Sequence, residues 1–136
     1  MDADGQHEGR YISKLVDKLE ESQIVTGSAS ERGIAYKGII WRILRLVSGI
    51  SLSDITSGFR AYTGDVMKIM VTYEGLIIDY QCIGVLLLCK KHGFVSKEVS
   101  VTMNPRKYGN SRIFKNSFDI IRYLVSTFLL IGVKRW

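Results

Sequence analysis

Residues 83–89 constrain the fold of this chain more than any other segment, because they contain no charged or hydrogen-bonding polar side chain. The surrounding run, from about residue 78 to residue 91, has the length and composition of a helix. A helix that is apolar on every side must be covered by other elements. We therefore expect this helix to lie buried in a layered domain.

The rest of the chain alternates between two apolar patterns. Apolar residues at helical spacing predict four further helices, at 9–23, 35–47, 64–71 and 114–136. Short runs rich in β-branched or aromatic residues predict three strands, at 23–27, 59–62 and 94–101. This alternation of helices and strands indicates an α/β fold.

Two of the predicted helices raise the question of a membrane. In helix 35–47, core packing is favoured over a membrane-facing role for the apolar residues Ile39, Ile40, Ile43, Leu44 and Val47. The terminal helix is nearly uncharged over 124–133, which is too short for a bilayer span of about 20 residues. The residues that follow are common at membrane interfaces: Lys134, Arg135 and Trp136. We therefore divide the chain into a domain over 1–113 and a membrane-proximal helix over 114–136.

The charge balance bounds the class of partner. The 136 residues include 19 Lys and Arg against 13 Asp and Glu, which gives a net charge of +6. Such a chain suits an anionic partner such as a nucleotide diphosphate, a lipid phosphate or a membrane surface, and a solvated basic surface is the alternative. Nucleic acid is disfavoured, because no recognised nucleic-acid motif is present and the cations are not interleaved with aromatic residues on a sheet.

The cysteines and the N-terminus bear on location. Cys82 and Cys89 fall about two turns apart on the predicted buried helix, so a disulfide between them is not expected. Reduced cysteines favour a cytoplasmic setting, including the inner face of the membrane. The acidic and polar N-terminus lacks the pattern of a signal peptide.

Three clusters of polar residues carry the chemistry, and the first reads DADGQH at positions 2–7. Alternate side chains of an extended segment point the same way, so Asp2, Asp4 and Gln6 can converge on one point. Hard cations such as Mg²⁺ and Mn²⁺ prefer oxygen ligands of this kind. The cluster therefore predicts a divalent metal site.

The second cluster reads DITSGFRAY at positions 54–62. Ser57 and Gly58 precede a predicted strand and can offer backbone N–H groups to a ligand that approaches closely. Arg60 can pair with a carboxylate or a phosphate. The alternative is a tight turn capped by Asp54.

The third cluster, at positions 98–112, holds three cations on one Gly-containing loop: Arg106, Lys107 and Arg112. Tyr108 and Ser111 stand beside them. Such a loop can fold over a diphosphate and neutralise its charge as it leaves. The alternative is an exposed basic loop with no ligand.

In this order and spacing the clusters resemble the family-2 glycosyltransferases, the GT-A group that includes dolichyl- and polyprenyl-phosphate sugar transferases. The resemblance is carried by DADGQH, DITSGFRAY, GFVSKEVSVTMNPRKYGNSR and the apolar terminal helix. It implies a partial GT-A (nucleotide-diphospho-sugar transferase) fold, a mixed sheet flanked by helices. The N-terminal nucleotide-binding strands of that fold would be lacking, so the chain would correspond to the C-terminal half of a transferase.

The resemblance also implies a role for each cluster. Mg²⁺ or Mn²⁺ would be held by Asp2, Asp4 and Gln6, and Asp2 would also contact the sugar diphosphate. The loop that closes over the diphosphate and an acceptor phosphate would supply Arg106, Lys107, Ser111 and Arg112. The acceptor side would be lined by Ser57, Gly58 and Arg60. The implied reaction is the inverting transfer of a sugar from a nucleotide diphosphate sugar.

The general base is the point at which the sequence departs from the family. Relatives often place a Pro-Glu pair where this chain has Gln81 and Cys82, and Asp79 is the nearest carboxylate. A hydroxyl acceptor needs a base close by, whereas a phosphate acceptor is already anionic. The sequence therefore favours polyprenyl phosphate over a saccharide as acceptor, with Asp79 and Arg106 as the catalytic residues.

A second reading is a non-catalytic remnant that acts as a membrane-associated binding or assembly module. Without the N-terminal strands, a sheet edge and apolar helix faces would be uncovered, and such surfaces associate. We therefore expect a homodimer or a complementing chain that supplies the N-terminal half.

Overall fold

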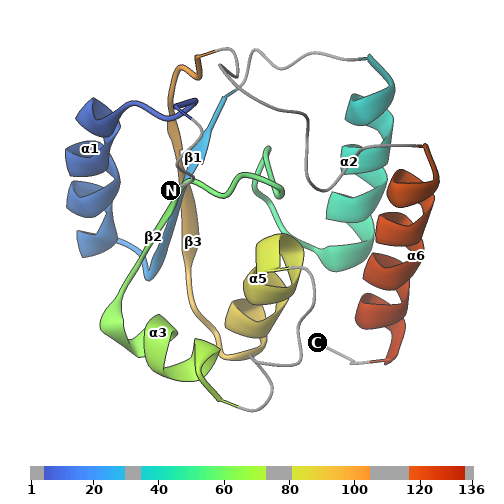
Figure 1. Ribbon diagram of the computed structural model, residues 1–136. Coiled ribbons are helices and arrows are strands. Elements are labelled where there is room, and N and C mark those ends of the chain that lie inside the picture. Colours follow the sequence, from blue (N-terminus) through green and yellow to red (C-terminus); the bar gives the residue numbers. More distant parts are fainter. Residues whose placement is uncertain (1–4, 30–34, 73–80, 105–116, 134–136) are drawn as a thin grey trace.

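The computed structural model describes residues 5–29, 35–72, 81–104 and 117–133, in which helices flank a small sheet (Figure 1). The helices are α1 (Ile12–Asp17), α2 (Ala35–Ser48), α3 (Gly64–Met70), α5 (Gln81–Lys91) and α6 (Ser117–Val133). The strands are β1 (Ile24–Ser28), β2 (Arg60–Tyr62) and β3 (Ser96–Ser100). Short 3-10 turns extend α1 at both ends, at Gly9–Tyr11 and Lys18–Glu20. Each predicted helix and strand has a counterpart, so the α/β class is confirmed.

Within the described residues the sheet has the order β2-β1-β3, and it is mixed, as expected. β1 runs parallel to β3, from Ile24 opposite Ser96 to Ser28 opposite Ser100. It runs antiparallel to β2, with Thr26 opposite Arg60. This topology is compatible with part of a GT-A fold, and the lack of N-terminal strands stays a prediction.

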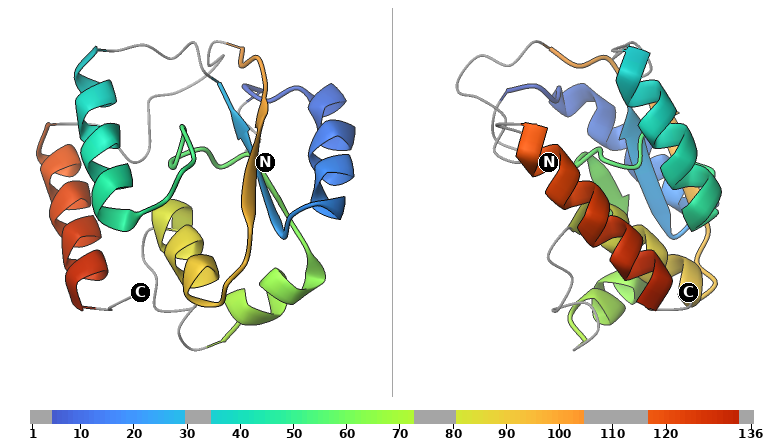
Figure 2. Two further views of the ribbon diagram at one scale, coloured as in Figure 1. Left: turned by 180° about the vertical axis from the view of Figure 1, so that it is seen from behind. Right: turned by 90° about the vertical axis from the view of Figure 1, so that its right-hand side faces the viewer.

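The sheet separates two apolar cores, because successive residues of β1 point to opposite faces. Val25 packs on one face with Tyr11, Leu15, Phe59 and Val101, beneath α1. Ile24 packs on the other face with α5 and the segment that follows α2. The views in Figures 1 and 2 show α1 on one side of the sheet and α2, α5 and α6 on the other.

Helix α5 lies at the centre of the larger core, as its sequence predicts. Residues 83–89 are all buried, and α6 contributes Leu124 and Ile131 to the same cluster. Cys82 and Cys89 are both free thiols, in agreement with the expectation. Burial raises the pKa of the Cys89 thiol to about 11, so this cysteine is an inert part of the core.

Helix α2 corrects one expectation. Of the apolar residues predicted to pack in the core, Leu44 is fully buried, but Ile43 and Val47 are 47% and 48% exposed. Ile39 and Ile40 fall where side chains are not described. The buried line of the helix runs from Leu44 to Ser48, one turn apart, and Ile43 and Val47 lie about 100° around the axis. The expectation of core packing is therefore wrong for Ile43 and Val47.

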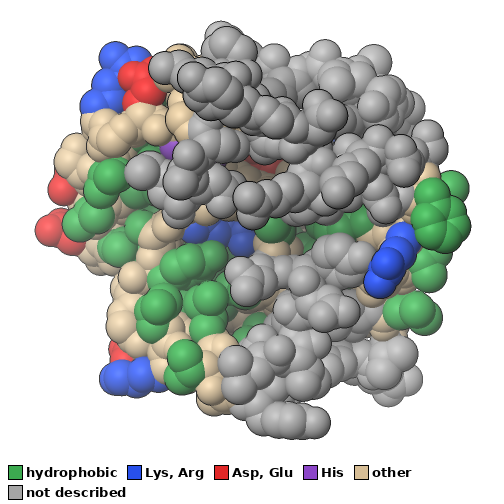
Figure 3. Space-filling view, viewed as in Figure 1, with side chains coloured by type: hydrophobic (Ala, Val, Ile, Leu, Met, Phe, Trp, Pro, Cys, Tyr) green, Lys and Arg blue, Asp and Glu red, His purple; other side chains and the backbone are tan. Residues whose placement is uncertain are grey.

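Helix α6 also presents apolar side chains to solvent. Its exposed apolar residues are Phe118, Ile121, Val125, Phe128 and Leu129. Figure 3 shows hydrophobic side chains gathered along the edge of the molecule that α6 occupies. None of the helices in the described part of the chain has the length and apolar character that a bilayer crossing requires. The predicted boundary between residues 113 and 114 lies outside the described residues.

Candidate functional site

The described ends of the first and third clusters lie side by side. The backbone N–H of Asn104 donates to the carbonyl oxygen of Gln6 at 3.0 Å. The next pair along, His7 and Met103, forms an isolated antiparallel bridge. Gln6 is buried. The backbone therefore brings the end of the acidic motif to the beginning of the basic loop.

The second cluster joins them at the carboxyl end of β1. The His7 ring stacks on Phe59, with ring centroids 4.7 Å apart. The Gly27 N–H donates to the carbonyl oxygen of Phe59 at 2.8 Å, and the Ser57 hydroxyl donates to the carbonyl oxygen of Gly27 at 2.7 Å. Ligands of open α/β sheets bind outside the carboxyl ends of strands, where these clusters meet.

The close approach of Phe59 to β1 requires a glycine. A Cβ atom added to Gly27 would lie 2.7 Å from Cδ1 of Phe59 and 3.3 Å from Cγ1 of Val101. Neither neighbour has room to retreat, because both belong to the buried cluster beneath α1. Gly27 therefore sets how tightly the second cluster packs against the sheet.

The predicted acceptor residues adopt the capped turn that the sequence allowed. One carboxylate oxygen of Asp54 accepts from the Thr56 N–H at 3.0 Å and from its hydroxyl at 2.9 Å. Ser57 is buried and Gly58 is exposed. The turn therefore presents Gly58 to solvent and turns Ser57 inward.

Arg60 makes two hydrogen bonds within the fold. Its Nη1 donates to the carbonyl oxygen of Cys82 at 2.5 Å, and its Nη2 donates to that of Ile55 at 2.8 Å. These bonds join β2 to the first turn of α5 and to the turn before Ser57. A role of Arg60 in binding an acceptor stays a prediction.

Two residues that the sequence reasoning missed hold this region together. Glu98 of β3 accepts hydrogen bonds from Ser53 and Asp54, at the start of the second cluster. The Tyr11 hydroxyl shares a short hydrogen bond with the Thr102 hydroxyl, and this bond lowers the pKa of Tyr11. Each partner pair is far apart in the sequence, so no local pattern could have found it. The only signal was the place of Glu98 on the polar face of its strand.

The remaining predicted site residues lie outside the described part of the chain: Asp2, Asp4, Asp79, Arg106, Lys107, Ser111 and Arg112. Their roles stay predictions. Across residues 5–29, 35–72, 81–104 and 117–133, no group of three His, Cys, Asp or Glu side chains could hold a metal ion. The chemistry of the predicted donor set, two carboxylates and an amide oxygen, fits a hard divalent cation.

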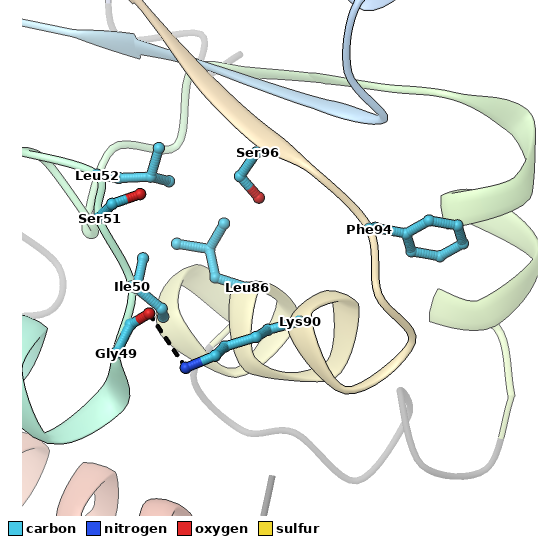
Figure 4. Close-up of a pocket in the computed structure, with 8 residues that line it drawn as sticks. All are labelled: Gly49, Ile50, Ser51, Leu52, Leu86, Lys90, Phe94 and Ser96. Atoms are coloured by element: carbon cyan, nitrogen blue, oxygen red, sulfur yellow. Dashed lines mark hydrogen bonds between the residues drawn. The ribbon is translucent and has the colours of Figure 1, made fainter.

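A pocket of about 130 Å³ opens elsewhere, near the amino end of β3 (Figure 4). Its lining includes Ile50, Leu86, Phe94 and Ser96. At its rim Lys90 Nζ donates to the carbonyl oxygens of Ser48 and Gly49, at 2.8 and 3.1 Å, and so caps the C-terminus of α2. The pocket contains none of the predicted site residues.

Comparisons with known proteins give relatives of one kind. No family model matches the chain, and no solved structure matches it significantly. The polyprenol monophosphomannose synthase of Mycolicibacterium smegmatis is 28% identical over 83% of this chain and 47% of its own length. The undecaprenyl-phosphate mannosyltransferase of Micrococcus luteus is 30% identical over 50% of this chain and 32% of its own length. The chain thus spans about half the length of the first of these relatives and less of the second.

Both relatives are family-2 glycosyltransferases, the group that the three clusters resemble. The match to the mycobacterial protein extends over most of the chain. The relationship of this chain to the family-2 glycosyltransferases is therefore confirmed, at modest identity.

Proposed function

We propose that this chain is a glycosyltransferase that moves a sugar from a nucleotide diphosphate sugar to a polyprenyl phosphate. The observation that carries the proposal is that the described ends of the three clusters lie together at the carboxyl end of β1, where Asn104 bonds to Gln6 and the neighbouring His7 stacks on Phe59. The names of both relatives specify a polyprenyl acceptor. Those names also specify mannose, so a mannosyl donor is the first to be tested.

The chemistry divides among the clusters. Arg106 and its basic neighbours stabilise the nucleoside diphosphate as it leaves, because fixed cations act most strongly where negative charge develops. The backbone N–H groups of Ser57 and Gly58 hold the acceptor phosphate, because the Ser57 hydroxyl already donates to Gly27. Asp2, Asp4 and Gln6 would hold Mg²⁺ or Mn²⁺, which would supply further charge neutralisation.

Inversion at the sugar follows from a single displacement. An oxygen of the acceptor phosphate forms a bond to the anomeric carbon as the bond from that carbon to the diphosphate oxygen breaks. The phosphate acceptor is already anionic, so it needs no proton removed by a base. With a phosphate acceptor, Asp79 is therefore not needed as a general base.

Titration calorimetry tests the proposal. GDP-mannose added with Mn²⁺ is expected to bind, UDP- and GDP-linked sugars serve as comparisons, and Asp4→Ala is expected to abolish the metal-dependent part of binding. Asp17→Ala, which removes an exposed carboxylate of α1, is the matched control and is expected to bind as the wild type does. Heat that is absent with every donor, or that Asp4→Ala leaves unchanged, would overturn the active-enzyme proposal.

A second candidate function is favoured by the exposed apolar face of α6. A membrane-associated module without turnover would keep this face and would bind vesicles without binding a donor. The donor titration and a vesicle-binding assay together separate the two functions, since only the enzyme requires both activities.

A further inference from the structure

We propose that Glu98 is a positioning residue for the acceptor side of the site. It holds the segment 53–56, which precedes Ser57 and Gly58, in the conformation that receives an acceptor phosphate. This inference rests on the proposed function. It adds a residue of β3 that neither the sequence motifs nor the comparisons assign.

The geometry around Glu98 is concentrated on one atom. Its Oε1 accepts from the backbone N–H of Ser53 at 2.8 Å, from the Ser53 hydroxyl at 2.9 Å and from the backbone N–H of Asp54 at 3.0 Å. Hydrogen bonds to an ionised oxygen are stronger than those between neutral groups. Three of them therefore fix the start of the segment to the middle of β3.

The Ser53 hydroxyl extends this attachment to β1. It lies 2.9 Å from the Ser28 hydroxyl. A serine hydroxyl has one proton, and the carboxylate of Glu98 can only accept, so Ser53 donates to Glu98 and Ser28 donates to Ser53. The chain of bonds from Ser28 through Ser53 to Glu98 thus joins the segment to the carboxyl end of the central strand.

Arg60 of β2, on the other side of β1 from β3, also holds this segment. Thr26 is the register partner of Glu98 on β3 and of Arg60 on β2, so these three residues form one row across the sheet. Residues opposite each other in neighbouring strands share a face. Arg60 binds the carbonyl oxygen of Ile55 at 2.8 Å, while Glu98 binds Ser53 and Asp54. The segment is therefore clamped at two points by charged side chains from the outer strands.

The remaining bonds transmit this constraint to the acceptor residues. The carboxylate of Asp54 fixes Thr56, and the hydroxyl of Ser57 fixes the segment to Gly27. Release of Ser53 and Asp54 would leave Gly58 on a segment held only from Ile55 onward. The contact between Gln6 and Asn104 does not pass through Glu98, so the donor side should keep its geometry.

The test compares acceptor and donor affinity in the full chain. Farnesyl phosphate serves as a soluble acceptor probe and GDP-mannose with Mn²⁺ as the donor, both measured by titration calorimetry. Glu98→Ala is expected to weaken farnesyl phosphate binding by about tenfold and to leave donor binding within about twofold. Glu98→Gln is expected to restore acceptor affinity to within about threefold of wild type, because its amide oxygen still accepts hydrogen bonds.

Two further variants guard the interpretation. Glu21→Ala removes an exposed carboxylate that contacts Lys97 in the same strand, and it is expected to change neither affinity. Ser53→Ala removes one of the three bonds and the link to Ser28, and it is expected to weaken acceptor binding by about threefold. This variant takes the place of Glu98→Ala if Glu98→Ala does not fold.

The possible outcomes are distinct. Wild-type farnesyl phosphate affinity in both Glu98→Ala and Ser53→Ala overturns this inference and leaves the proposed function standing. Equal loss of donor and acceptor affinity in Glu98→Ala also overturns it, because a general structural role would produce that result. Failure of the wild-type chain to bind farnesyl phosphate overturns the proposed acceptor, and this inference with it.

Discussion

Gly27 occupies a position where a single methyl group would disturb two neighbours. The Gly27→Ala variant is expected to lose about 1–3 kcal/mol of unfolding free energy, because overpacking a filled core forces its neighbours to move. The added methyl group would lie 2.7 Å from Cδ1 of Phe59, so this ring would have to shift, together with the His7 ring stacked on it. Chemical denaturation followed by circular dichroism measures the change.

Gly64 provides the control for that substitution. It is the first residue of α3, and a Cβ atom added there meets nothing within 4 Å. Gly64→Ala is expected to change the unfolding free energy by less than about 1 kcal/mol, and in the stabilising direction, because alanine favours helices. Equal losses in the two variants would contradict the role given to Gly27.

The ion pairs of Glu21 are expected to make the free energy of unfolding depend on pH. Its carboxylate lies 2.5 Å from Lys97 Nζ and 3.0 Å from Lys18 Nζ. The hydrogen bond from Lys97, followed by that from Lys18, lowers the pKa of Glu21 from 4.5 to about 2. A pKa that is lower in the folded state gives stability that is complete above pH 4.5 and is lost as the pH falls toward 2.

The Glu21→Gln variant tests this dependence. It removes the titrating group, so its stability is expected to fall less steeply than that of the wild type between pH 4.5 and 2. The effect is small, since exposed ion pairs are screened by solvent. Urea denaturation at a series of pH values measures it, and parallel wild-type and variant curves over that range would refute it.

At the residue scale, sequence reasoning reached what is local and missed what is not. The turn capped by Asp54 could be predicted, because its partner Thr56 is two positions away. The part played by Glu98 could not, since its partners Ser53 and Asp54 come from a different loop. Arg60 was predicted by type, but its bonds to Ile55 and Cys82 depend on how β2 meets α5.

At the scale of elements, periodicity predicted the helices but not the sides they bury. Helix α2 has apolar residues over a wide arc, and only the packing of its neighbours decides that Leu44 faces the core while Ile43 and Val47 face outward. Leu46 of the same helix is 85% exposed. Helix α5 was easier, because a helix that is apolar on every side has only one possible environment.

Helix α6 carries the membrane prediction. Ile121 and Leu129 are 57% and 60% exposed on its surface, and Arg122 is exposed beside them. The Ile121→Gln/Leu129→Gln variant is expected to bind vesicles of phosphatidylglycerol and phosphatidylcholine roughly tenfold more weakly than wild type, because two apolar side chains no longer enter the lipid. Co-sedimentation with the vesicles measures the bound fraction.

An apolar pair on another helix controls for general surface hydrophobicity. Met67 of α3 and Val71 just beyond it are exposed to a similar degree. The Met67→Gln/Val71→Gln variant is expected to sediment with vesicles as the wild type does. Equal losses in both double variants would show that α6 has no special part, and unchanged binding in both would remove α6 from the membrane proposal.

For the whole molecule, the alternation of helices and strands was enough to predict the α/β class, and the order of the strands was not. The parallel pairing of β1 with β3 joins segments separated by about half of the chain. The sequence specifies each of these strands but carries no local mark of which strands are neighbours. That pairing brings the described start of the third cluster to the carboxyl end of β1, and its contacts with Gln6 and His7 became visible only in three dimensions.

The molecule as a whole is expected to self-associate. Within the described residues, β2 and β3 each pair with β1 alone. Helices α2 and α6 lie next to each other at one side of the molecule (Figure 2), and each has exposed apolar residues. Open sheet edges and contiguous apolar surface both favour contact between chains. In lipid-free buffer the chain is expected to form a dimer whose fraction rises with concentration, as measured by size-exclusion chromatography with light scattering.

Membrane binding and dimerisation can both use the exposed apolar face of α6, so the same variants test both. If α6 supplies the contact between chains, then Ile121→Gln/Leu129→Gln lowers the dimer fraction as well as vesicle binding. Vesicles added to the wild-type chain should bind it as a monomer, which chemical cross-linking on the vesicle surface detects, because lipid then covers the face that a second copy would use. A chain that stays monomeric at every concentration would contradict self-association, and dimers that persist in the double variant would assign the contact to the sheet edges instead.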